Sequence, residues 1–235
     1  MSTDRQSGAG GAANGGALTL DRGLRVLELL AAEDRDFAVA EIASELSMHR
    51  QAVYRLLNTL TAHHLAARTD SGRYCLGLGV LRLSHLANSQ LRRLVLPQLR
   101  RLAESLESTA QCVVAEGNEA VALSVVEPEN AAFHLSQHPG ARHPLEQGAS
   151  GIAILSSRPP TPGEPQEVTK ARELGYVVTS GQLTAGAVGI ATPLRDRTGQ
   201  PLNASIGIVS LRELDIEEAA AAVMAAAANI SEFGA

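Results

Sequence analysis

The sequence predicts an α+β protein of two domains: an N-terminal domain of helices closed by a β-hairpin and, after a connecting helix, a C-terminal domain with an antiparallel sheet. Two observations carry this prediction. Apolar residues recur at helical spacing in the region before Leu65, and from Gln111 the pattern changes to short β-rich runs separated by turns. The 235 residues, 45% of them hydrophobic, are enough for two packed cores.

The N-terminal domain is expected to begin after a flexible tail, because residues 1–17 are mostly Gly, Ala and Ser with little to bury. Apolar spacing then predicts three helices, at residues 19–33, 40–46 and from 50 onward. The stripe of the first helix consists of Leu20, Leu24, Leu27 and Leu30. Strand-like residues on both sides of Asp70, Ser71 and Gly72 predict a hairpin after the third helix, and the domain is assigned residues 18–77.

A linker helix is expected over residues 78–96. Proline lacks the backbone N–H and clashes with the preceding turn, so Pro97 should divide the helical run and begin the C-terminal domain, residues 97–235. The leucines of this helix are candidates for pairing across a two-fold axis, which predicts a homodimer or a dimer of dimers. They are Leu78, Leu81, Leu86 and Leu94. Packing within one chain is the alternative.

The C-terminal domain should alternate strands and helices. Strands are expected at residues 112–117, 120–127, 132–137, 175–181, 188–196 and 203–211. Helices are expected from 148, over 166–174 and over 216–230. This mixture predicts an α+β domain with an antiparallel sheet.

Composition narrows the function classes. The chain has neither an apolar run of about 18 residues nor the pattern of a signal peptide, so a cytoplasmic protein without membrane contact is expected. Cys75 and Cys112 have no metal-binding spacing and are predicted to be free thiols. The net charge of −5 is concentrated in residues 111–235, with 7 basic and 14 acidic groups. Lys170 is the one lysine, so the cations are almost all arginines, which suit phosphates and guanine edges.

The third predicted helix has two unlike sides. In SMHRQAVYRLLNTL, residues 47–60, a wheel at about 100° per residue groups Val53, Leu56, Leu57 and Leu60 on one side and polar side chains on the other. Three residues separate it from the preceding helix, as in a helix-turn-helix, and the hairpin completes a winged helix. A polar side can simply face solvent, but these residue types reach phosphates and base edges.

We therefore predict that this helix contacts double-stranded DNA and that the two hairpin arginines touch the flanking backbone or minor groove. The residues assigned to DNA binding are Ser47, His49, Arg50, Gln51, Tyr54, Arg55, Asn58, Arg68 and Arg73. A winged helix that serves only protein contacts is the alternative, and an electrophoretic shift of DNA separates the two.

Residues 20–77 resemble the N-terminal winged helix of the IclR family of bacterial transcription regulators, in the motifs LDRGLRVL, AEIASELS, VYRLLNTL and GRYCLG. HPLEQGASGIAIL and ARELGYVVTSGQLTAGAVGIATPLRD resemble its C-terminal part. The resemblance implies a recognition helix in the major groove, dimerisation through the connecting helix, and a GAF-like domain that binds a small effector, often an organic or aromatic acid. The sequence departs from the family pattern at residues 47–52, so its operator sequence should differ from those of other members. Gln182 stands where an acidic residue is frequent, and the segment 156–170 is short.

Small residues crowd GASG at 148–151 and TAGAVGIAT at 184–192, which suits either tight packing or a ligand site. Amides at the start of a helix there would favour a carboxylate. With the positions that the resemblance implies, the effector site is predicted to comprise Ala149, Ser150, Gly151, Thr179, Gln182, Gly189 and Ser205. An apolar wall is expected from Leu123, Ile190 and Ile206.

Catalytic, metal and cofactor sites are not expected. Ser150 lacks the G-x-S-x-G elbow of hydrolases, and no Walker loop or dinucleotide fingerprint is present. The spacing of His134, His138 and His143 suits neither a zinc finger nor an H-E-x-x-H helix.

Overall fold

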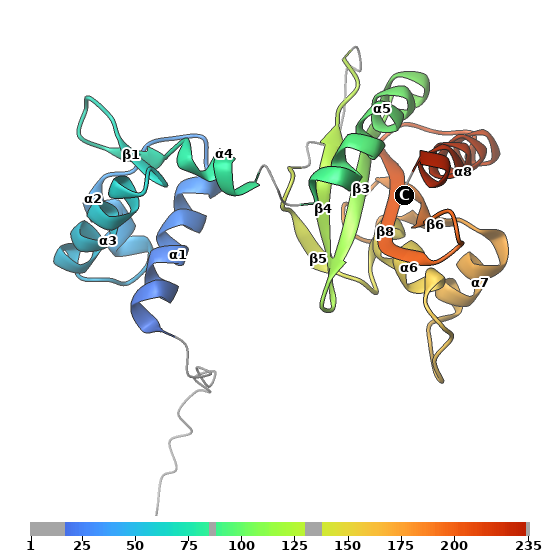
Figure 1. Cartoon of the computed structure of the whole chain (residues 1–235), viewed down its shortest axis with the longest axis horizontal. Coiled ribbons are helices and arrows are strands. Elements are labelled where there is room, and N and C mark those ends of the chain that lie inside the picture. The colour runs from blue at the N-terminus through green and yellow to red at the C-terminus, as the bar shows by residue number, and fades with distance from the viewer. Residues whose placement is uncertain (1–16, 85–87, 130–137, 234–235) are drawn as a thin grey trace, which may run out of the picture. The chain divides into compact units, whose positions relative to one another are not determined.

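The computed structural model describes residues 17–84, 88–129 and 138–233, and the chain divides into two compact units between residues 87 and 88. The elements of the first unit are α1 (Leu18–Ala32), α2 (Val39–Glu45), α3 (Arg50–Ala62), β1 (Ala66–Arg68), β2 (Tyr74–Leu76) and α4 (Gly79–Ser84). Figure 1 shows α1, α2 and α3 grouped around one core, with the β1–β2 hairpin beside them. The predicted tail falls almost wholly on residues that the structure does not describe.

The core of the N-terminal domain forms where α1, α2 and α3 meet, around the fully buried Phe37, Ile42 and Leu57. α1 is rotated relative to the predicted stripe: Gly23, Val26 and Leu30 are buried, whereas Leu20 and Leu24 are 63% and 50% exposed. A Cβ built on Gly23 would lie 3.8 Å from Leu56 of α3. This is an ordinary contact distance, so Gly23 lies on the side of α1 that faces α3, and the leucines beside it turn outward.

The hairpin is a wing of three-residue strands, in which Ala66 pairs with Leu76 and Arg68 with Tyr74. Phe37 joins it from the α1–α2 loop, because the N–H and C=O of Phe37 and Tyr74 exchange two backbone hydrogen bonds of 2.8 Å. The wing is therefore fastened to the helical core at its base.

The connecting segment differs from the expectation. α4 ends at Ser84 and the next helix, α5 (Ser89–Leu106), is single and contains Pro97. Pro97 is exposed, so water can satisfy the carbonyl that loses its helical partner. Asn88, with a left-handed φ of 48°, precedes α5 and sets its start. Leu94 packs against the C-terminal core, and Leu86 lies outside the described residues.

The C-terminal unit contains a six-stranded antiparallel sheet in the order β5-β4-β3-β8-β7-β6. After α5 its elements are β3 (Thr109–Glu116), β4 (Glu119–Val126), β5 (Arg142–Pro144), α6 (Gly148–Ser157), α7 (Gln166–Leu174), β6 (Val177–Ser180), β7 (Val188–Arg195), β8 (Pro201–Ser210) and α8 (Ile216–Phe233). The fold class is as predicted. The strand expected at 132–137 falls outside the described residues, and the three-residue β5 is too short for a sequence pattern to reveal.

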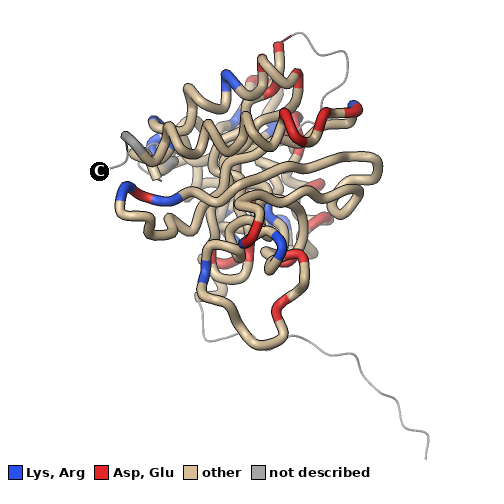
Figure 2. The backbone as a smooth tube through the Cα atoms, turned by 90° about the vertical axis from the view of Figure 1, so that its right-hand side faces the viewer, with Lys and Arg blue, Asp and Glu red and all other residues tan. Residues whose placement is uncertain are grey.

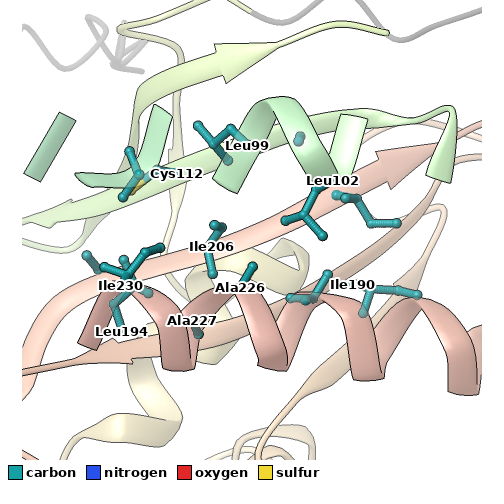
Figure 3. Close-up of a cluster of buried hydrophobic side chains, with 14 of the residues drawn as sticks. Leu99, Leu102, Cys112, Ile190, Leu194, Ile206, Ala226, Ala227 and Ile230 are labelled. Atoms are coloured by element: carbon teal, nitrogen blue, oxygen red, sulfur yellow. The ribbon is translucent and has the colours of Figure 1, made fainter. Parts of the chain in front are cut away.

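Helices cover both faces of this sheet. α5 and α8 pack on one face, where Leu99, Cys112 and Ile206 are fully buried (Figure 3). α6 and α7 pack on the other, against residues such as Val113 and Ala191. Because side chains alternate along a strand, neighbouring residues of β3 and β8 serve opposite faces. The sheet thus lies between the core under α5 and α8 and the smaller cores against α6 and α7.

The remaining surface features agree with the composition. Acidic positions occur on several loops and helices of the C-terminal unit, with basic positions between them (Figure 2).

Cys75 and Cys112 are both free, as predicted, and burial raises the pKa of the Cys112 thiol to about 12. Within the described residues, no helix is long and apolar enough to cross a membrane.

Candidate nucleic-acid interface and ligand pocket

The turn between α2 and α3 sets the direction of the third helix. Ser47 adopts a left-handed φ of 52°, and the Met48 N–H donates to the Ala43 carbonyl at 2.8 Å, which closes the turn. A non-glycine residue in this conformation carries a modest strain. His49 is extended and precedes the first helical residue, Arg50. The three-residue turn is therefore formed without the glycine that usually occupies such a position.

α3 divides its residues between the core and solvent. Val53, Leu57 and Leu60 are buried against α1 and α2. Its exposed residues include five assigned to DNA binding, namely Arg50, Gln51, Tyr54, Arg55 and Asn58, and the turn before it exposes two more, Ser47 and His49. The helix thus presents one continuous polar ridge of guanidinium, amide and phenol groups.

The arginines of this domain differ in whether they form ion pairs. Arg35 pairs with Glu33 and Glu41 near the α1–α2 loop, and Arg35 also covers the ring of Phe37 with its guanidinium 4.0 Å from the ring centroid. In the described part of the chain, no ion pair holds Arg50 or Arg55. Glu33 and Glu41 are thus paired with Arg35, while Arg50 and Arg55 of α3 stay exposed.

The two wing arginines have different surroundings. Arg68 is exposed, with its guanidinium 5.9 Å from the centroid of the Tyr74 ring. Arg73 is half-buried: its Nη2 contacts Glu41 Oε2 at 2.6 Å and donates to the Asp36 carbonyl at 2.8 Å, and its Nε donates to the same carbonyl. We therefore withdraw Arg73 from the DNA-binding set, because its nitrogens fasten the wing to the start of α2. Sequence spacing could not reveal these partners, which lie more than 30 residues away.

A small pocket of about 30 Å³, partly open to solvent, lies where α6 begins, beside the end of β6 and the start of β7. It is lined by Gln111, His143, Gly148, Ala149, Ser150, Thr179, Gln182, Leu183, Thr184, Ala187, Gly189, Ile208 and Val209. A Cβ on Gly189 would lie 3.2 Å from both the Ala149 Cβ and the Thr179 Oγ1, so glycine brings β7 close to the helix. None of the lining residues is Lys or Arg.

The hydrogen bonds of the pocket converge on the first turn of α6. The Gly148 N–H donates to Gln182 Oε1 at 2.8 Å, and the Gln111 amide donates to Ser150 Oγ at 3.2 Å. The first N–H groups of a helix have no partner within it, and the helix dipole makes this end favourable for negative charge. In this structure, the Gln182 side chain supplies a neutral acceptor there.

The structure brings five of the seven predicted effector residues to this pocket: Ala149, Ser150, Thr179, Gln182 and Gly189. The other two lie elsewhere. A Cβ on Gly151 would approach the Leu145 carbonyl to 2.4 Å, so this glycine serves close packing of α6, and Ser205 is fully buried on β8 away from the lining.

The predicted apolar wall is wrong. Ile190 and Ile206 are buried on the opposite face of the sheet, in the core under α5 and α8, and Leu123 packs against the same core. Residue type alone does not tell which face of a sheet a strand residue takes.

Sequence reasoning missed Gln111, His143, Leu183 and Thr184. Gln111 had a signal, because it is a polar residue inside an otherwise apolar strand. Leu183 and Thr184 adjoin the predicted Gln182. Of the three histidines weighed as metal ligands, His134 lies outside the described residues; the described part contains no cluster that could hold a metal ion.

A winged helix with an exposed polar third helix, followed by a separate α+β domain, is the arrangement of a class of DNA-binding proteins that carry a second domain. Comparison with known proteins specifies the family. Residues 19–70 match the family profile described as the IclR helix-turn-helix domain. The N-terminal domain is therefore an IclR-type helix-turn-helix domain, and the chain as a whole is similar to HTH-type transcriptional regulators.

Relatives and solved structures extend the similarity beyond that domain. The chain is 29% identical over 222 residues to the HTH-type transcriptional regulator BhcR of Paracoccus denitrificans, which covers 83% of this chain and 78% of that protein. An IclR transcriptional regulator from Alicyclobacillus acidocaldarius has a TM-score of 0.77 at 21% identity, covering 94% and 100% of the two chains. An IclR homologue from Microbacterium hydrocarbonoxydans, solved with 4-hydroxybenzoate, also has a TM-score of 0.77, at 23% identity over 91% and 98%.

Proposed function

We propose that this regulator binds a double-stranded DNA operator through α3 and the wing, as a homodimer, and that a small organic acid in the C-terminal pocket modulates its operator affinity. One observation carries the proposal: two features occur in one chain. They are an exposed ridge of polar groups on α3 and a pocket at the N-terminus of α6, which Gly148 lines.

The DNA contact is supported by the chemistry of the α3 ridge. Arginine forms bidentate bonds to guanine, and glutamine or asparagine forms them to adenine. Gln51 and Asn58 lie opposite the buried side of α3, with Arg50 and Arg55 on either flank. We assign base reading to Arg50, Gln51 and Asn58 of this ridge and backbone contact to Arg68 of the wing.

The effector class is supported by the lining of the pocket. A carboxylate there would be held by the N–H groups of α6 and by neutral polar side chains such as Ser150 and Thr179, since no lysine or arginine lines the pocket. The relative solved with 4-hydroxybenzoate carries an acid of this class. We infer a small carboxylic acid for this chain.

An electrophoretic shift titration with DNA from the region upstream of the gene tests the proposal. Wild-type protein should shift this DNA specifically and with strong dependence on salt. Arg50→Ala should weaken binding by about 1–3 kcal/mol, roughly 5- to 150-fold, because the variant cannot bond to a base or phosphate at this position. Tyr54→Phe should weaken it less, since only a hydroxyl is removed.

Both variants should melt like the wild type, because the two side chains are exposed. Wild-type affinity in the Arg50→Ala protein would contradict the placement of α3. The absence of any sequence-specific shift would contradict the regulator proposal as a whole and would leave the winged helix to protein contacts.

A further inference from the structure

A second group of arginines lies beside the α3 ridge, on a helix that the sequence pattern does not assign to DNA. Arg22 and Arg25 of α1 are exposed, and both line a groove of about 550 Å³, open to solvent, together with Arg55 of α3. The floor of the groove is the α2–α3 turn, including Ser47 and His49. Three guanidinium groups from two helices therefore share one groove at the start of the recognition helix.

These arginines are not used to hold the fold. In the described part of the chain, no ion pair or hydrogen bond engages the side chains of Arg22, Arg25 or Arg55, whereas Arg35 and Arg73 of the same domain are both paired with Glu41. Glu45 is the one acidic residue of the groove. The groove keeps a net positive charge that the domain itself does not neutralise.

The position of the two arginines on α1 follows from how that helix packs. Gly23, Val26 and Leu30 face the core, so at about 100° per residue Arg22 and Arg25 fall on one flank of the buried stripe. The exposed Leu20 and Leu24 fall on the other flank. Because Gly23 faces Leu56 of α3, the basic flank of α1 lies beside the recognition helix.

Geometry identifies the partner as a DNA strand. The major groove is about 12 Å wide and an α-helix with its side chains about 10–12 Å across, so a helix in the groove has the phosphates of each strand just beyond its flanks. Arg55 lies on the flank of α3 that faces the groove with Arg22 and Arg25. Guanidinium groups at that distance meet backbone phosphates rather than base edges.

We propose that Arg22 and Arg25, together with Arg55, bind the phosphates of one operator strand and so add sequence-independent affinity to the reading by α3. This inference rests on the proposed DNA-binding function and adds a DNA-binding surface on α1. Each phosphate that the protein neutralises contributes about 0.9 to the salt dependence of log affinity, so an arginine bound to a phosphate has a characteristic signature when it is replaced.

The test measures operator affinity and affinity for unrelated DNA over a series of salt concentrations, for the full chain and for Arg22→Gln and Arg25→Gln. Each substitution should reduce the salt slope by about 0.9 for every phosphate that is no longer neutralised, and should weaken binding to both DNAs by the same factor. Glu45→Gln, which removes the acid of the same groove, should strengthen binding. Arg101→Gln, an exposed arginine of α5, should leave it unchanged.

If the salt slopes of Arg22→Gln and Arg25→Gln are unchanged while wild-type protein binds its operator, the arginines of the groove do not bind phosphates. The proposed function would then still stand. A wild type that binds no DNA would instead overturn the proposed function. If the two substitutions weakened operator binding but not binding to unrelated DNA, the arginines would read bases and the phosphate assignment would be wrong.

Discussion

Gln182 occupies the hydrogen-bonding position that a bound carboxylate would need. Its Oε1 accepts the Gly148 N–H at 2.8 Å, and a Cβ on Gly148 would approach Leu183 to 2.5 Å, so residues of the β6–β7 loop lie directly over the start of α6. Both loop residues are exposed and can move at little cost in buried area. We infer that an acid entering the pocket displaces the Gln182 amide.

Gln182→Ala should therefore raise the affinity for the acid. A neutral hydrogen bond contributes about 0.5–1.5 kcal/mol net, so removal of the competing acceptor should tighten binding about 2- to 10-fold. Gln182→Glu should weaken it, because a fixed carboxylate would repel the ligand. Isothermal titration with a panel of small carboxylic acids that includes 4-hydroxybenzoate measures both effects.

A blocked pocket supplies the matched control for that experiment. Ser150→Trp should abolish the response to every acid in the panel while operator binding persists, since Ser150 lies in the C-terminal unit and lines the pocket. An acid that still changed operator affinity in this variant would act at another site and would contradict the assignment. A panel in which no acid alters operator binding by the wild type would contradict the effector class.

Among the elements, the short segment before α7 is held by one carboxylate. Glu164 receives hydrogen bonds from Arg172 of α7, from the Thr169 hydroxyl at 3.1 Å and from the Thr161 N–H. The Arg172 bond is the largest cause that lowers the pKa of Glu164 to about 2 from its ordinary 4.5. This network fixes the loop against the helix although the segment is short.

A carboxylate whose pKa is lowered on folding stabilises the protein above its unfolded pKa, and the stabilisation is lost as the pH falls through the folded value. Glu164→Gln should accordingly melt at a lower temperature than the wild type at neutral pH, and the difference should shrink as the pH falls from about 4.5 toward about 2. Scanning calorimetry across this range measures it. Glu167→Gln, at an exposed position of α7, should show no such pH-dependent gap, and a gap of equal size there would contradict the role of Glu164.

At the scale of the whole molecule, exposed leucines on two helices of the N-terminal unit favour association with a partner. Leu20 and Leu24 are exposed on α1, and Leu83 of α4 is 69% exposed. Exposed apolar side chains of this size favour burial against another surface. The homodimer proposed for operator binding supplies one, a second copy of the same domain.

Leu24→Gln combined with Leu83→Gln should weaken binding to an operator with two half-sites at least about tenfold, because the second reading head is no longer held at high effective concentration. Binding to an isolated half-site should stay unchanged, which distinguishes a failure to dimerise from a failure to fold. Leu174→Gln, an equally exposed leucine of α7, is the control. Equal affinities of the double variant and the wild type for the full operator would contradict this dimer interface.

Local periodicity in the sequence was sufficient to predict most of the helices and strands, the limits of α7 and the outward residues of α3, but not the short β5 or the continuity of α5 through Pro97. Periodicity shows which side chains share a face, but it does not show which neighbour covers that face. Only the folded chain reveals that α1 turns Leu20 and Leu24 outward, that Arg73 pairs with Glu41, and that Ile190 and Ile206 lie on the far side of the sheet from the pocket. Each of these features depends on contacts between segments far apart in the chain, and no spacing within one segment records them.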